Sequence, residues 1–187
     1  MSGERVRRIG VMGGTFDPIH YGHLVTAEGA RTEFGLDEVW FVPAGQPPHK
    51  DPSTVTAAEH RYMMTVLATL SNRYFHVSRV DIDREGPSYA IDTLRALKAQ
   101  CGPGCELYFI TGADAILEIL TWKDAALLLQ EWRFIAATRP GFQLERLQSR
   151  LGDWWEQCAD RITFLQVPAL AISSTDIRRR VSENRSI

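Results

Sequence analysis

Residues 7–23 read RRIGVMGGTFDPIHYGH, and the interpretation of the whole chain starts from this stretch. Its first half is a short apolar run that ends in two glycines, which is typical of a buried parallel strand. Apolar and small residues then recur at helical spacing from Tyr21 to about Phe34, and Gly35 follows as a stop signal. A glycine-rich turn with two histidines therefore joins a predicted strand to a predicted helix.

The rest of the chain continues this alternation of strands and helices. Further strands are expected over residues 37–43, 74–80, 106–112, 132–140 and 162–168. Further helices are expected over 56–70 (with Met63, Met64, Leu67 and Leu70 on its apolar side), 88–100 (with Ser88 as its N-cap), 124–130, 144–157 and 173–181. The alternation predicts an α/β fold of the doubly wound, Rossmann-like type, with a mainly parallel sheet and helices on both faces.

Length and composition fit a single domain over residues 1–187. A formal net charge of −2 does not favour nucleic-acid binding, which usually needs a strongly basic surface. No apolar run is long enough to cross a membrane, and the N-terminus does not resemble a signal peptide. We therefore expect a cytoplasmic protein with neither a nucleic acid nor a membrane as partner.

The three cysteines do not form the framework of a disulfide-rich fold. The segment CGPGC, residues 101–105, offers a short disulfide, two metal ligands or a plain loop. A zinc site needs about four ligands, and no second Cys or His pair accompanies this one. The plain loop is the expectation, and whether Cys101 and Cys105 pair stays open.

In doubly wound folds, ligands bind beyond the carboxyl ends of the strands. The unusual segments of this chain each follow a predicted strand, so they are expected to gather at one edge of the sheet: GGTFDPIHYGH, PAGQPPHK, TGAD, TRPG and ISSTDIR. The functional site is therefore expected at that edge.

The first of these segments predicts a phosphate site. Gly13 and Gly14 have no Cβ, so the backbone can approach an anion closely. The helix that begins near Tyr21 directs free N–H groups to the same place, where His20 and His23 can also donate hydrogen bonds. The pattern is neither a Walker loop nor GxGxxG. A glycine turn with incidental histidines and a metal-binding histidine pair are the alternatives.

A second constellation is ISSTDIR, residues 172–178. Its hydroxyl residues at 173–175 can cap a helix and leave donors for a phosphate, and the fork of Arg178 suits phosphate oxygens. The alternative is an ordinary N-cap followed by basic residues that favour the helix dipole. Arg179 and Arg180 are interpreted in that second way.

Together, GGTFDPIHYGH and ISSTDIR resemble the two signatures of the HxGH-type nucleotidyltransferase superfamily. Further segments are similar to the bacterial nicotinate-nucleotide adenylyltransferases, and the likeness covers nearly the whole chain: PPHK (47–50), EGPSYAIDTL (85–94), ITGAD (110–114), TW (121–122) and RPG (139–141). The resemblance implies a nucleotidyltransferase fold and transfer of the adenylyl group of ATP to nicotinate mononucleotide, with release of pyrophosphate, in NAD biosynthesis.

The resemblance also implies roles for the matching residues. At the reacting phosphates we expect His23 on the α-phosphate, His20 on neighbouring oxygens, Arg178 on the leaving phosphates and Lys50 as an added positive charge. ATP binding is expected from Gly13, Gly14, Thr15, Phe16, Ile172, Ser173, Ser174 and Thr175. Nicotinate mononucleotide binding is expected from His49, Ser88, Tyr89, Thr93, Gly112, Asp114, Trp122 and Arg139. Mg²⁺ is expected to arrive with ATP and to bind phosphates and water, so no residue is named as a metal ligand.

Three departures from the family pattern bear on these expectations. Ala90 stands where the family often has Thr, and Lys123 follows Trp122 where Tyr is common. The chain also ends at SENRSI where the family usually continues, so either the sequence is truncated or this protein lacks that end. Ala90 leaves the strictness of the nicotinate preference open. The alternatives are another adenylyl- or cytidylyltransferase of the superfamily, or a non-catalytic nucleotide sensor. A homo-oligomer is neither predicted nor excluded.

Overall fold

The computed structural model describes residues 5–187, and at its centre is a six-stranded parallel sheet. The strands are β1 (Arg7–Gly14), β2 (Glu38–Pro43), β3 (Phe75–Val77), β4 (Cys105–Gly112), β5 (Arg133–Thr138) and β6 (Ile162–Gln166). Their order is β3-β2-β1-β4-β5-β6, and every neighbouring pair is parallel. The predicted doubly wound fold is confirmed.

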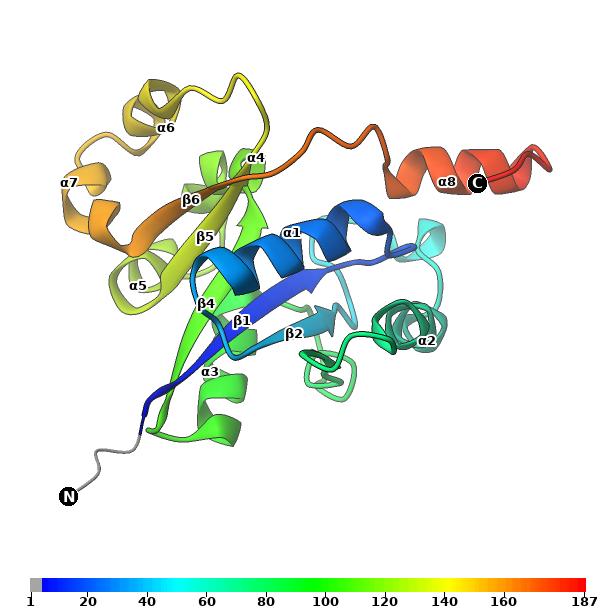
Figure 1. Cartoon of the computed structure of the whole chain (residues 1–187), viewed down its shortest axis with the longest axis horizontal. Helices are drawn as coiled ribbons and strands as arrows, with labels where there is room; N and C mark the ends of the chain where they lie inside the picture. The colour runs from blue at the N-terminus through cyan, green and yellow to red at the C-terminus, as the bar shows by residue number, and fades with distance from the viewer. Residues whose placement is uncertain (1–4) are drawn as a thin grey trace.

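Helices cover both faces of this sheet (Figure 1). They are α1 (Tyr21–Glu33), α2 (Ala58–Thr69), α3 (Ala90–Cys101), α4 (Ala113–Leu117), α5 (Ala125–Glu131), α6 (Leu144–Leu151), α7 (Trp154–Cys158) and α8 (Ser174–Ser182). Two apolar clusters fill the core: α1 and α2 pack into one, and α3, α5, α6 and α7 pack into the other. Side chains alternate between them along β1, where Ile9 and Val11 belong to one cluster and Met12 to the other.

The order of the strands reverses at β1, which lies between β2 and β4. The turn after β1, the loop after β2 and the helix after β4 therefore meet at the carboxyl edge of the sheet, where such folds bind ligands. Figure 1 also shows that α8 projects from the body at the end of the segment that follows β6.

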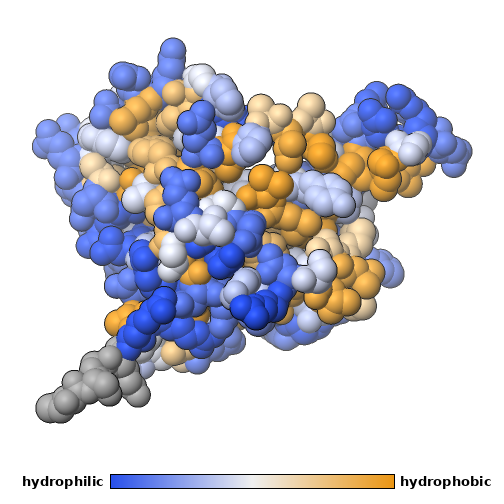
Figure 2. All heavy atoms as spheres, in the orientation of Figure 1, coloured by the Kyte–Doolittle hydropathy of each residue, from blue (hydrophilic) through white to orange (hydrophobic). Residues whose placement is uncertain are grey.

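Helix α2 is rotated relative to the expectation from its apolar pattern. Met63 and Leu67 are exposed, as is Leu70 directly after the helix, whereas Met64 packs against the core. Figure 2 shows apolar atoms where this helix reaches the surface. Its buried residues are polar: Arg61, Thr65 and Thr69. Each threonine hydroxyl donates to the carbonyl four residues earlier, so the polar groups are satisfied inside the protein. The predicted apolar side is therefore wrong for Met63, Leu67 and Leu70 and correct for Met64.

Other local expectations also need correction. The predicted helix over 144–157 is two helices, because Gly152 reverses the chain with φ 53°. Ser88 does not cap α3: Tyr89 is the N-cap residue, and the Ser88 Oγ accepts the N–H of Gly45 at 2.9 Å instead. The strand predicted over 74–80 is reduced to β3.

Cys101 and Cys105 are joined by a disulfide, with their Cα atoms 6.2 Å apart. The plain loop was therefore the wrong expectation. Gly102 has φ 75° and turns the chain back directly after α3, which brings the two cysteines together. Among the residues that the structure describes, no helix combines the length and apolar character needed to cross a membrane.

Candidate active site

Hydrogen bonds within the turn after β1 hold its two histidines in place. His20 is the N-cap residue of α1, and its Nδ1 accepts the N–H of Gly22 at 3.1 Å. The His23 Nδ1 accepts the N–H of His20 at 3.2 Å. The two rings stack with their centroids 3.9 Å apart, and Phe16 packs edge-on against His23. Both side chains are therefore fixed by residues within the same short segment.

These bonds also determine what the histidines can donate. Since each Nδ1 accepts a main-chain N–H, a neutral ring carries its proton on Nε2. Burial lowers the pKa of His20, and burial together with the neighbouring His20 lowers the pKa of His23 to about 4. In the free protein near neutral pH, both rings are neutral and each presents an Nε2–H donor.

The C-terminal signature packs against the same turn. The Arg178 Nη1–H donates to the carbonyl of Asp17 at 2.6 Å, and the Ser174 Oγ–H donates to the carbonyl of Pro18 at 2.8 Å. The Ser173 Oγ caps α8 by accepting the N–H of Asp176. Residues some 160 positions apart are thus joined, which is consistent with the two signatures forming one site.

Arg179 and Arg180 behave as the sequence suggests. Both donate to the carboxylate of Asp176 on the same helix. These two bonds and the neighbouring positive charges hold the pKa of Asp176 down, at about 2. The two arginines are therefore engaged within α8.

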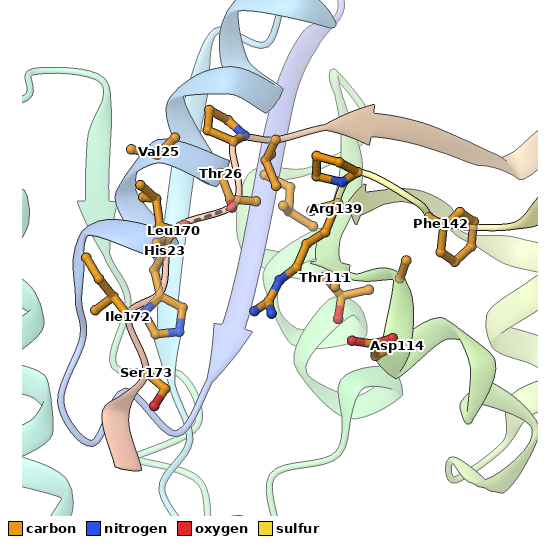
Figure 3. Close-up of a pocket in the computed structure, with 18 of the residues that line it drawn as sticks. His23, Val25, Thr26, Thr111, Asp114, Arg139, Phe142, Leu170, Ile172 and Ser173 are labelled. Carbon is orange, nitrogen blue, oxygen red and sulfur yellow. Dashed lines mark hydrogen bonds between the residues drawn. The ribbon is translucent and has the colours of Figure 1, made fainter. Parts of the chain in front are cut away.

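A first cavity of about 590 Å³ opens beside the histidines. Figure 3 shows His23 and Ser173 on one side of it, Thr111 and Asp114 on the other, and the guanidinium of Arg139 pointing between them. Gly13, His20, Gly112 and Ile172 also line it. At the carboxyl ends of β1, β4 and β5, the cavity combines N–H donors, the guanidinium of Arg139 and one carboxylate, and Arg146 of α6 adds a second guanidinium.

A second cavity of about 330 Å³ lies on the other side of the β1 turn. It is lined by the loop after β2, the start of α3 and Trp122, and the predicted site residues in it are Gly13, Gly14, Thr15, His49, Lys50, Ser88, Tyr89, Thr93 and Trp122. Gly13 lines both cavities, so they adjoin at the end of β1.

The structure divides the predicted residues differently from the sequence-based expectation. Gly112, Asp114 and Arg139 were grouped with Trp122, but they line the first cavity. Gly14 and Thr15 were grouped with ATP, but they line the second. The sequence placed these residues at strand ends without revealing on which side of β1 each strand end opens.

Four predicted residues line neither cavity: Phe16, Ser174, Thr175 and Arg178. Phe16 is only 2% exposed and packs against His23 and Phe41. Ser174 and Arg178 are bonded to the main chain of the turn, and Thr175 lies within reach of Arg178. In this structure these residues shape the turn rather than the walls of the cavities.

A buried polar network in the wall of the second cavity was not anticipated. The Thr93 Oγ1–H is directed at the carboxylate of Asp81, 2.7 Å away, and Arg84 pairs with the same carboxylate at 2.8 Å. Burial is the main cause that raises the pKa of Asp81. The hydroxyl of Thr93 therefore has a protein partner already. In the sequence, DIDREG looks like a charged surface loop, and only the fold shows that Asp81 is buried.

Comparisons with known proteins identify the family of this chain. A model of the family described as cytidylyltransferase-like matches residues 11–180. A relative from Moorella thermoacetica named "Probable nicotinate-nucleotide adenylyltransferase" is 63% identical over 183 residues, which cover 98% of this chain and 84% of the relative. A relative of the same name from Thermoanaerobacter sp. is 57% identical, with 98% and 87% covered.

A solved structure supports the fold. The nicotinic acid mononucleotide adenylyltransferase of Plasmodium falciparum complexed with NaAD superposes with a TM-score of 0.76 at 22% identity, covering 96% of this chain and 86% of that one. The match of the family model, the identity over nearly the full chain and the shared fold lead to one assignment. This chain belongs to the nicotinate-nucleotide adenylyltransferase family of cytidylyltransferase-like proteins.

Proposed function

We propose that this protein transfers the adenylyl group of ATP to nicotinate mononucleotide, giving nicotinate adenine dinucleotide and pyrophosphate. The observation that carries the proposal is the pair of cavities that share Gly13, with two imidazole donors beside their junction. Two substrates that must react with each other need adjoining sites. The names of the relatives support the same reaction. Because the reaction consumes ATP, we expect it to take place in the cytoplasm.

We assign ATP to the first cavity and the mononucleotide to the second. The first cavity contains the donors and the guanidinium that suit a triphosphate, with Asp114 available to a ribose hydroxyl. The second contains Trp122 and Tyr89, whose aromatic faces suit a cationic pyridine ring. This assignment moves Gly112, Asp114 and Arg139 to the ATP side.

The chemistry needs no base. An oxygen of the mononucleotide phosphate attacks the α-phosphorus of ATP; a new phosphorus–oxygen bond forms, and the bond to the bridging oxygen of the β-phosphate breaks. Pyrophosphate leaves with the electron pair of that bond. The nucleophile is already an anion at neutral pH, so the obstacle is repulsion between two anions. Catalysis then consists of positioning and of neutralising charge.

The residues around the junction of the two cavities supply both the positioning and the neutralisation of charge. The Nε2–H groups of His20 and His23 donate to oxygens of the reacting phosphates, where charge develops. Lys50 adds a positive charge from the second cavity. Arg178, on α8, holds the turn that carries the histidines in place by donating to the carbonyl of Asp17.

Mg²⁺ would enter with the triphosphate. Within residues 5–187, no group of three or more His, Cys, Asp or Glu side chains is arranged to hold a metal ion. Asp114 is the one carboxylate among the residues described around the first cavity. The donors there suit phosphate rather than a bare cation, so phosphate oxygens and water would hold the ion, which neutralises charge on the phosphates.

The test measures pyrophosphate release in the presence of Mg²⁺. ATP or CTP is offered with nicotinate mononucleotide, nicotinamide mononucleotide or phosphopantetheine in separate reactions. We expect rapid release with ATP and nicotinate mononucleotide, loss of release in His23→Asn, and no loss in His60→Asn, an exposed histidine on α2. A preference for CTP or for another acceptor would overturn the proposal. ATP binding without turnover would show a nucleotide sensor instead.

A further inference from the structure

Arg61 is a charged residue that the fold buries completely. It lies near the start of α2, and its side chain is 1% exposed. A buried guanidinium is unfavourable unless its N–H groups find acceptors and its charge is balanced. The arrangement of its partners therefore shows what the residue holds together.

The Arg61 guanidinium donates to three main-chain carbonyls. The Nε–H donates to Thr56 at 2.7 Å, Nη1–H to Thr15 at 2.7 Å and Nη2–H to Gly45 at 3.2 Å. These carbonyls belong to three segments: the turn after β1, the loop after β2 and the residues that lead into α2. One side chain therefore joins three parts of the backbone.

Two of these acceptors bracket residues 46–55, which we call the Pro-rich loop. Gly45 precedes the loop and Thr56 follows it, so Arg61 holds both of its ends. The loop carries His49 and Lys50, which line the second cavity. The third acceptor, Thr15, follows the glycines at the junction of the two cavities. Arg61 thus fixes the loop relative to that junction.

The base of the Pro-rich loop has a second anchor on the opposite side. The Ser88 Oγ accepts the N–H of Gly45 at 2.9 Å, and the Ser88 N–H donates to the carbonyl of Gln46 at 2.9 Å. A Cβ on Gly45 would come within 2.3 Å of the carbonyl oxygen of Asp81, so only glycine fits there. Gly45 is held between Arg61 and the start of α3.

Asp17 balances the charge. It is 4% exposed, and its Oδ2 accepts the N–H of Thr56 at 3.2 Å. Burial lowers the pKa of Arg61, and the negative charge of Asp17 opposes that shift, so the guanidinium keeps its proton. The carbonyl of Asp17 also accepts from Arg178 on α8. The Arg61 cluster is therefore linked to the C-terminal signature as well.

We propose that Arg61 is a positioning residue: it fixes the β1 turn and both ends of the Pro-rich loop relative to each other, so that Lys50 and the histidine pair face the same reacting phosphates. The inference rests on the proposed adenylyl transfer. Lysine cannot replace this arginine, because an ammonium lacks the planar fork that reaches three carbonyls at once.

The test compares four variants of the full-length protein. Arg61→Lys keeps the charge and removes the fork. Asp17→Asn keeps the shape of the side chain and removes the balancing charge. It tests the same inference if Arg61→Lys does not fold. Arg79→Lys is the matched control, because Arg79 is a partly exposed arginine that pairs with Glu59 of α2 and with Asp83, outside the Arg61 cluster. Leu151→Ala, in the core at the end of α6, is the control for lost stability alone.

Two readouts are measured on each variant. The first is hydrogen exchange of the substrate-free protein, which does not depend on any activity. We expect Arg61→Lys to exchange faster in residues 13–17 and 44–57, with β4 and β5 unchanged. The second is steady-state kinetics. We expect kcat to fall about 100-fold and KM to rise roughly tenfold for both substrates. Asp17→Asn should show the same pattern more weakly.

The controls separate positioning from stability. A protein that is only destabilised loses active molecules and keeps its KM, which is the expectation for Leu151→Ala. Arg79→Lys should match the wild type in both readouts. Uniform exchange changes in Arg61→Lys, or unchanged KM values, would overturn the inference. If the wild type shows no adenylyl transfer, the proposed function fails while hydrogen exchange still decides whether Arg61 anchors the loop.

Discussion

The two cavities that meet at Gly13 are built from different kinds of side chain. The first is lined by the histidine pair, Arg139 and main-chain groups at strand ends, and the second by Trp122, Tyr89 and prolines of the loop after β2. The difference teaches that the two tasks of the proposed reaction are separated in space. In the proposed assignment, most of the phosphate charge is handled in the first cavity, with Lys50 contributing from the second, and a flat ring is recognised in the second.

The largest effect on activity is expected from substitution of a residue proposed to bind phosphate in the first cavity. His23→Asn removes the Nε2–H donor while keeping a polar side chain of smaller size. Loss of one preorganised donor to developing charge typically lowers kcat by about 10²–10³-fold. We expect that loss in kcat with little change in the dissociation constant for ATP, measured by calorimetry. An equal loss of ATP affinity would show that His23 binds the ground state as well as the transition state.

The same histidine also makes stability depend on pH. Its pKa is about 4 in the folded protein and 6.5 when unfolded, so the unfolded chain binds more protons between these values. The free energy of unfolding therefore falls as pH drops through that window. From pH 7 to pH 5 the contribution of His23 amounts to at most about 2 kcal/mol.

Urea unfolding of the wild type and of His23→Asn at both pH values measures this contribution. The variant should lose less stability on acidification. His20, whose pKa is also lowered, still contributes in the same direction in the variant. Identical losses in the two proteins would contradict the buried, neutral state of His23 and the donor role that follows from it.

Substitution of the residue proposed to recognise the ring in the second cavity is expected to change KM rather than kcat. Trp122 lines the second cavity and packs edge-on against Phe109. Trp122→Ala removes its aromatic face, and a cation–π contact of about 1–2 kcal/mol corresponds to a rise in KM for nicotinate mononucleotide of roughly 5- to 30-fold. Trp122→Phe should restore most of the affinity. A rise of the same size in the KM for ATP would show that Trp122 contributes to the ATP site rather than to recognition of the pyridine ring.

The sequence located the histidine pair more precisely than it located the residues at the ends of β4 and β5, for a physical reason. His20 and His23 are positioned by bonds to residues two and three positions away, so a short segment contains its own geometry. The sheet followed from the alternation of strands and helices. The side of β1 on which Asp114 and Arg139 lie depends on strand order, which no local pattern records.

Arg61 and Asp81 escaped prediction because their roles depend on distant partners. Arg61 occupies a position that helical periodicity assigns to the polar face of α2, and its acceptors come from Thr15 and Gly45. The carboxylate of Asp81 accepts a hydrogen bond from Thr93 of α3. In the sequence, a charged residue that the fold buries cannot be distinguished from one on the surface, because its partners are known only from the fold.

The smallest effect is expected at Lys123, a charged residue at the wall of the second cavity. The Lys123 Nζ is 2.8 Å from the carboxylate of Asp92 and 5.0 Å from the centre of the Tyr89 ring, at the wall of the second cavity. Its side chain is 43% exposed and already paired, so solvent screens its field. We expect Lys123→Met to lower the preference for nicotinate over nicotinamide mononucleotide by about threefold or less, measured as the ratio of kcat/KM values. Ala90→Thr, which adds a hydroxyl to the same cavity, should leave the phosphate chemistry unchanged. A fall in kcat with both substrates would show that Lys123, like Lys50, takes part in the handling of charge.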